Sequence, residues 1–200
     1  MSHRDYRLLW TGTFLTQTGR WMQEVAVGWL VLDLTGSAFF LGLAGFLRSI
    51  PMLVLSLPGG VLADRMHRAR LLGTFQALAA ILTLVLALLV ASSHVQAWQV
   101  LLLTFLIGCA MAMVFPVRQA LVPSVVPRED LANAVGLNAA GNNITRVAGP
   151  ALAGVLIGLV GVSFCFLLNA LGLFGALVTS LVMRVPSANK RPPVLGMRES

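Results

Sequence analysis

The sequence predicts an all-α membrane protein with six transmembrane helices. Three observations predict this class: 58% of the 200 residues are hydrophobic, 10% are charged, and the mean hydropathy is +0.87. A water-soluble core of this size could not bury so much apolar surface, and the remaining polar groups could not cover it. The composition therefore argues against a soluble enzyme and against a free-standing nucleic-acid-binding protein.

Charge clusters, prolines and glycines divide the chain into six apolar runs. A helix needs about 20 mainly apolar residues to cross a bilayer, and each run is long enough. The predicted spans are 8–34, 39–62, 71–92, 98–117, 131–159 and 162–183. The fifth is the most polar, so we expect neighbouring helices to shelter it from lipid. Its polar residues are Asn138, Asn142, Asn143, Thr145 and Arg146.

Basic residues fall in alternate connections between the predicted spans. They precede the first span and follow the second, fourth and sixth, whereas the connections around Gly36, His94 and Val160 contain neither Lys nor Arg. Arg118 is predicted to lie in the connection after the fourth span. The positive-inside rule then places both termini in the cytoplasm. We predict a six-helix bundle over residues 1–183 and a basic, proline-containing tail or start of a central linker over residues 184–200.

Several charged side chains lie within the predicted spans, where an isolated charge is unfavourable against lipid. Arg20 and Glu24 are four residues apart and share one helix face. With Arg48, Asn142 and Arg146 they are predicted to line a polar transport cavity. Glu24 is either a proton-coupling carboxylate or a charge partner of Arg20 or Arg48. Two further cations at membrane depth, Arg48 and Arg146, either attract an anionic substrate or satisfy backbone carbonyls and asparagines.

Enzyme and metal signatures are not found in the sequence. There is no HExxH or GxSxG motif, and the glycine pair Gly59-Gly60 lacks the Lys-Ser/Thr of a phosphate-binding loop. Cys109 and Cys165 form no CxxC motif. We therefore expect no enzyme activity, metal, cofactor or nucleic-acid partner, and we expect any transport to be driven by an ion gradient.

Residues 60–70 read GVLADRMHRAR at the predicted cytoplasmic end of the second span. This segment resembles the signature loop of the major facilitator superfamily, of form G-x-L-A-D-R-x-G-R, between its second and third helices. His67 stands where that family usually has glycine. The resemblance implies a gating loop that includes Gly60, Asp64, Arg65 and Arg68.

A second resemblance lies in the fifth span. Its small residues and proline are similar to the packing motif of the fifth helix in exporters of that superfamily, and they are Gly136, Thr145, Gly149, Pro150, Ala153 and Gly154. Small residues allow close helix packing. Together with PVRQA at 116–120, VPREDL at 126–131 and Asn133-Ala134, the pattern is similar to the enterobactin-exporter and macrolide-efflux branch.

The resemblance implies a proton-linked exporter of a siderophore, drug or other small molecule in a bacterial inner membrane. Such transporters have two six-helix halves, each a pair of inverted three-helix repeats, with the substrate site between the halves. By this resemblance, the chain corresponds to the N-terminal half. The segment after Arg184 favours a piece of a longer transporter over a homodimer that rebuilds the cavity. The alternative function is a non-transporting membrane scaffold or accessory half-permease.

Overall fold

The computed structural model describes residues 3–65, 68–125 and 130–182. These residues form six long helices. The helices are α1 (His3–Thr35), α2 (Ala38–Arg65), α3 (Arg68–Ala91), α4 (Ala97–Val125), α5 (Leu131–Leu159) and α6 (Val162–Val182). Gly36 and Gly161 lie in the turns after α1 and α5 with φ values of +60° and +97°, a backbone region that glycine adopts without strain.

Four of the described helices are long and apolar enough to cross a membrane. They are α2, α3, α4 and α6, over the windows Ala38–Leu55, Leu71–Ala91, Ala97–Arg118 and Val162–Ser180. The other two helices have similar lengths but carry more polar residues, including Arg20 and Glu24 in α1 and Arg146 in α5. The all-α membrane class predicted from composition agrees with this architecture.

The predicted fourth span, 98–117, agrees with the apolar, membrane-length window Ala97–Arg118 of α4, but the connection after it was expected to begin too early. Helix α4 continues through Pro116 and ends at Val125, so Arg118 lies within the helix and not in the connection that follows it. An arginine after an apolar run normally indicates the water interface. Here its guanidinium donates hydrogen bonds to α1, so the helix continues with the cation turned toward a neighbouring helix and not toward lipid.

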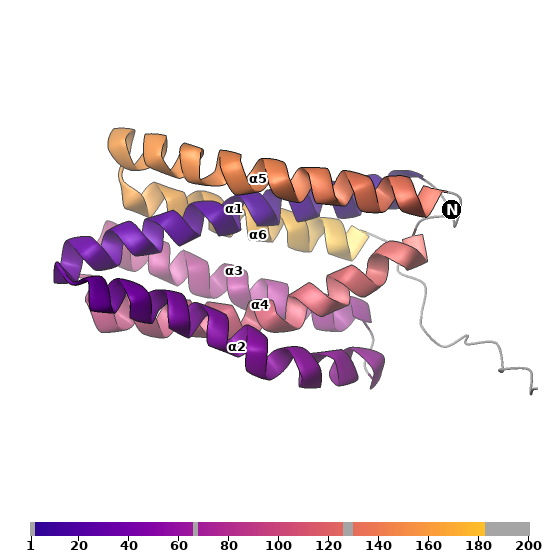
Figure 1. Cartoon of the computed structure of the whole chain (residues 1–200), viewed down its shortest axis with the longest axis horizontal. Coiled ribbons are helices and arrows are strands. Elements are labelled where there is room, and N and C mark those ends of the chain that lie inside the picture. Colours follow the sequence, from indigo (N-terminus) through magenta and orange to yellow (C-terminus); the bar gives the residue numbers. More distant parts are fainter. Residues whose placement is uncertain (1–2, 66–67, 126–129, 183–200) are drawn as a thin grey trace, which may run out of the picture.

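Helix α1 lies at the centre of the bundle. It contacts α6 and α5 most extensively, and also α2 and α4, while α3 packs between α4 and α6. Figure 1 shows α5 and α2 along opposite sides of the bundle, with α1 between them. The α1–α5 contact is close because Gly149 has no side chain: a Cβ there would lie 2.5 Å from Trp21 Cβ.

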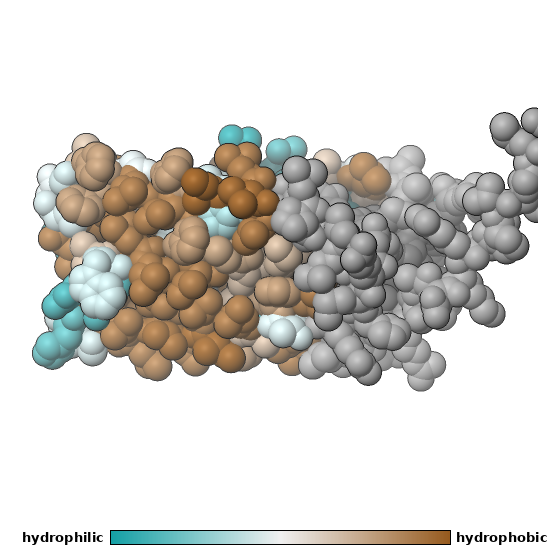
Figure 2. Space-filling view, turned by 90° about the horizontal axis from the view of Figure 1, so that it is seen from below, coloured by the Kyte–Doolittle hydropathy of each residue, from teal (hydrophilic) through white to brown (hydrophobic). Residues whose placement is uncertain are grey.

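The outer face of the bundle is mainly hydrophobic. Figure 2, seen from the side of α2, shows a mainly hydrophobic surface over the described residues, with hydrophilic residues at one end and at a few places along one edge. Exposed apolar side chains on α2 include Phe39, Phe46, Leu53 and Val54. An apolar belt of this kind is suited to contact with lipid tails.

Candidate binding cavity

The larger described cavity, of about 290 Å³, lies between α1, α4 and α5, with one residue from α2. It is close to the lower end of the range of small-molecule sites, about 300–1000 Å³. The lining combines polar, aromatic and thioether side chains. Those residues are Trp10, Thr13, Phe14, Thr16, Gln17, Arg20, Met52, Met111, Val114, Phe115, Arg118, Asn138, Gly141 and Asn142.

A chain of hydrogen bonds joins α1 to α5 along this cavity. Arg20 Nε donates to Gln17 Oε1 at 3.1 Å, and Gln17 Nε2 donates to Asn142 Oδ1 at 2.9 Å. The α-helical spacing of three residues places Arg20 and Gln17 on one face of α1. The Gln17 amide therefore fixes both the Arg20 guanidinium and the α5 asparagine at the cavity wall.

Arg118 enters the same cavity from α4. Its Nη1 donates to the carbonyl oxygen of Gly12 and to Thr16 Oγ1, both at 3.3 Å. Its Nε is buried and has no hydrogen-bond partner in the described part of the chain. Sequence reasoning missed this residue because it stands two positions after Pro116 at the end of an apolar run, where a solvent-exposed connection was expected.

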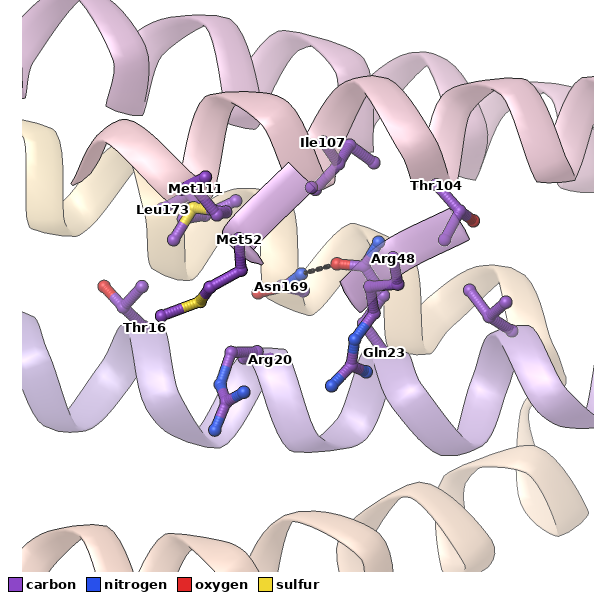
Figure 3. A pocket seen from close by; sticks show the side chains of 13 residues that line it. Thr16, Arg20, Gln23, Arg48, Met52, Thr104, Ile107, Met111, Asn169 and Leu173 are labelled. Carbon is purple, nitrogen blue, oxygen red and sulfur yellow. Dashed lines mark hydrogen bonds between the residues drawn. The ribbon is translucent and has the colours of Figure 1, made fainter. Parts of the chain in front are cut away.

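A smaller cavity of about 90 Å³ lies deeper, between α1, α2, α4 and α6, and shares Thr16, Arg20, Met52 and Met111 with the larger one. Figure 3 shows Gln23 and Asn169 joined by a hydrogen bond at its wall. Asn169 Nδ2 donates to Gln23 Oε1, and both side chains are buried. This α1–α6 pair was also missed, because its members are 146 positions apart in the sequence.

Glu24 forms an ion pair with Arg48. Arg48 Nη2 lies 2.7 Å from Glu24 Oε2, and the side chains are 28% and 43% exposed for Arg48 and Glu24. Arg48 lines the smaller cavity, whereas Glu24 lines neither cavity. The charge-partner alternative for Glu24 thus matches the observed geometry, and the pair joins α1 to α2.

The structure places the other predicted cavity residues as follows. Arg20 and Asn142 line the larger cavity, and Arg20 also lines the smaller one. Arg146 lines neither; it is exposed, with its Cζ 5.7 Å from the centre of the Trp21 ring. Arg20 Cζ lies 4.5 Å from the same ring, so Trp21 contacts two cations.

The predicted packing residues of α5 divide into two groups. Thr145, Gly149 and Ala153 are buried, and Gly149 lies directly against α1. Pro150 is half-buried inside the helix. A Cβ at Gly136 or Gly154 would meet no described atom within 4 Å. The predicted gating loop spans the end of α2 and the start of α3; His67 lies outside the described residues, as do the side chains of Gly60, Asp64, Arg65 and Arg68.

A polar cavity at the centre of an apolar helical bundle is typical of a membrane carrier. A family model described as "Transmembrane secretion effector", of the major facilitator superfamily, matches residues 1–195. The chain belongs to this family. It is thus a member of a membrane transporter family, as the residue pattern at 60–70 indicated.

Relatives in this family include transporters of two kinds. The chain is 29% identical over 176 residues to the staphyloferrin A transporter of Staphylococcus aureus, covering 88% of this chain and 44% of that protein. It is 25% identical over 183 residues to macrolide efflux protein A of Streptococcus pyogenes, covering 92% and 45%. The chain therefore spans less than half the length of these curated relatives.

The fold also resembles a solved transporter structure. The match is to an inward-facing, unoccupied bacterial homologue of the human lysosomal transporter Spinster, with a TM-score of 0.71 and 16% identity. It covers 95% of this chain and 45% of the solved chain. At this identity the match shows the fold, and it agrees with one half of a major facilitator transporter.

Proposed function

We propose that this chain forms the N-terminal, six-span half of a secondary transporter that exports a small molecule from a bacterial cell. The observation that carries the proposal is the cavity between α1, α4 and α5, lined by Arg20, Arg118, Gln17 and Asn142. Polar side chains at membrane depth are unfavourable, and they usually mark a substrate or ion pathway. A scaffold does not need guanidinium and amide groups around an internal cavity, whereas a transporter does.

The exposed polar side chains of α5 support a second half or a second copy of this chain. Asn142, Asn143 and Arg146 are exposed near the middle of the helix. An arginine at the centre of a lipid-facing helix is unfavourable by about 2.5–3.5 kcal/mol on insertion scales. We infer that another six-helix unit covers this face, with the substrate pathway between the two units.

Export and proton coupling are further parts of the proposal. The names of the staphyloferrin A and macrolide relatives support a siderophore or a drug as the substrate class. For coupling we propose Glu24, because its carboxylate lies in a central helix and its only described ionic partner is Arg48. Protonation of Glu24 would break its ion pair with Arg48. Because this pair joins α1 to α2, proton binding would be coupled to a rearrangement between these two helices.

We also propose an arrangement for the chain in the membrane. Both termini would be cytoplasmic, and the segment with Gly60, Asp64, Arg65 and Arg68 would brace the cytoplasmic gate against the second unit. The two nested three-helix repeats would rock as one body, as in other carriers of this architecture. The distribution of basic residues in the sequence supports this orientation.

Transport in inside-out membrane vesicles tests the proposal. The vesicles contain this chain together with the second six-helix unit that the proposal requires. They should accumulate a radiolabelled macrolide or staphyloferrin A when a proton gradient is imposed. Accumulation should stop when an uncoupler collapses the gradient. Glu24→Gln should abolish gradient-driven accumulation and retain gradient-independent exchange, because the neutral amide cannot carry the proton.

The control is Asp33→Asn, which removes an exposed carboxylate near the end of the same helix. It should leave accumulation unchanged. Full proton-driven accumulation by Glu24→Gln would overturn the coupling role. If a well-folded protein neither accumulates nor exchanges either compound, the result would contradict transport of these two substrate classes and favour the scaffold alternative.

A further inference from the structure

The charged groups of the larger cavity are unbalanced. Arg20 and Arg118 both line it, and no carboxylate is present among its described lining residues. Glu24, the acid nearest along α1, is paired with Arg48 outside this lining. Glu24 and Arg48 both act electrostatically on Arg20, with opposite signs, and Arg118 has no carboxylate partner among the described residues. The cavity therefore has a net positive potential inside a low-dielectric bundle, and such a potential attracts anions.

Arg118 retains unused capacity to donate hydrogen bonds. Its contacts to Gly12 and Thr16 are long, at 3.3 Å each, and its buried Nε has no described partner. A guanidinium has five N–H groups in a fork that matches a carboxylate or phosphate. A buried donor without a partner is unfavourable, so a bound acceptor at this point would be favoured.

The apolar residues of the lining suit an apolar ligand body. The rings of Trp10 and Phe14 are stacked with centroids 5.3 Å apart, and Met52 and Met111 contribute flexible thioether side chains. Figure 3 shows Met52 and Thr16 facing one another beside Arg20. The amides of Gln17, Asn138 and Asn142 in the same lining offer further donors and acceptors.

We propose that this cavity binds an amphipathic organic anion, whose anionic group is held by Arg20 and Arg118 and whose apolar body rests on Trp10, Phe14 and the methionines. The inference rests on the proposed function, because it assigns a substrate class to the same cavity. It favours a carboxylate-bearing compound over a cationic drug: a cation there would meet two guanidiniums and no acid among the described lining residues.

A set of fluorescent ligands with one ring system and different charges tests the inference. Dansyl-aspartate is a dianion, its diamide is neutral, and dansylcadaverine is a cation. Binding to the full chain is measured in nanodiscs of zwitterionic phosphatidylcholine, so that the lipid adds no net charge. We expect the dianion to bind at least about tenfold more tightly than the other two, a difference of about 1.4 kcal/mol.

Arg118→Gln and Arg20→Gln should each weaken binding of the dianion by about tenfold and leave binding of the diamide unchanged. Arg118→Lys should restore part of the affinity, because it keeps the charge and loses the fork. The control is Arg7→Gln, which removes the same charge from an exposed position outside the cavity lining. Circular dichroism and size-exclusion chromatography confirm that each variant is folded.

Equal binding of the three ligands, or tighter binding of the cation, would overturn the inference. So would an equal loss of affinity in Arg7→Gln and Arg118→Gln, because that result would indicate a general surface potential. The nanodisc measurement requires no transport. If the nanodisc assay shows no preference for the anion but the vesicles transport the macrolide, the anion site is refuted and the proposed function is not. If the assay shows the preference but the vesicles transport nothing, the proposed function is refuted and the anion site is not.

Discussion

The α3–α6 pair and the α1–α5 pair place their polar side chains differently. Gln76 on α3 and Ser180 on α6 are buried against one another, with Ser180 Oγ donating to Gln76 Oε1 at 3.0 Å. On α5, by contrast, Asn142, Asn143 and Arg146 are exposed. Buried polar pairs inside a membrane bundle mainly hold helices together, whereas exposed polar groups at membrane depth indicate a water-filled pathway or a further protein surface.

The hydropathy of the helices reflects the same difference. Helices α3 and α6 are apolar enough to cross a membrane by themselves, and α1 and α5 do not reach the same hydropathy. The α1–α5 pair therefore depends on neighbours for its stability in a bilayer. The polar residues that lower the hydropathy of this pair include those of the hydrogen-bond chain from Arg20 through Gln17 to Asn142.

The largest change in stability is expected when the α1–α5 contact is forced apart. Gly149→Leu places a Cβ 2.5 Å from Trp21 Cβ and 3.1 Å from the Thr18 carbonyl oxygen, so α5 must move. We expect the free energy of unfolding to fall by about 1–3 kcal/mol or more, measured by denaturation in mixed micelles. Gly154→Leu is the control, because no described atom lies within 4 Å of its Cβ. A similar loss in both variants would contradict close α1–α5 packing.

A much smaller change is expected in the α3–α6 pair. Gln76→Leu should alter the free energy of unfolding by less than about 1 kcal/mol. The substitution removes the Gln76 Nε2 group, which is buried without a described partner, and the single hydrogen of the Ser180 hydroxyl can donate instead to the Ala176 carbonyl oxygen at 2.8 Å. A loss above about 2 kcal/mol in the same assay would mean that the Gln76–Ser180 bond is a main connection between these helices.

The sequence predicted the helices better than the site, for physical reasons that particular residues illustrate. Gly161 and the apolar run before it fixed the end of α5, and the structure agrees with the predicted range 131–159. Arg118 was misassigned because local composition cannot distinguish an arginine that faces water from one that donates to another helix. The Gln23–Asn169 pair joins helices far apart in the sequence, so no local pattern could reveal it.

The polar cavity residues were predicted in part. Arg20 and Asn142 were identified because charged and amide groups stand out within apolar runs, and both line the larger cavity. Arg146 stood out equally, yet it lies over Trp21 and outside both cavities. Sequence indicates which side chains need shelter from lipid, and only the packing of the helices determines whether a cavity, a ring or another side chain provides that shelter.

Cysteine accessibility tests the central claim most directly, namely that the α1–α5 polar residues line an aqueous pathway. In a background without Cys109 and Cys165, single cysteines replace Gln17 or Asn142 in the cavity and Leu78 or Ile81 on the exposed apolar face of α3. A water-soluble maleimide should label positions 17 and 142 rapidly and leave positions 78 and 81 unlabelled. Labelling at 17 and 142 that is no faster than at 78 and 81 would contradict the account.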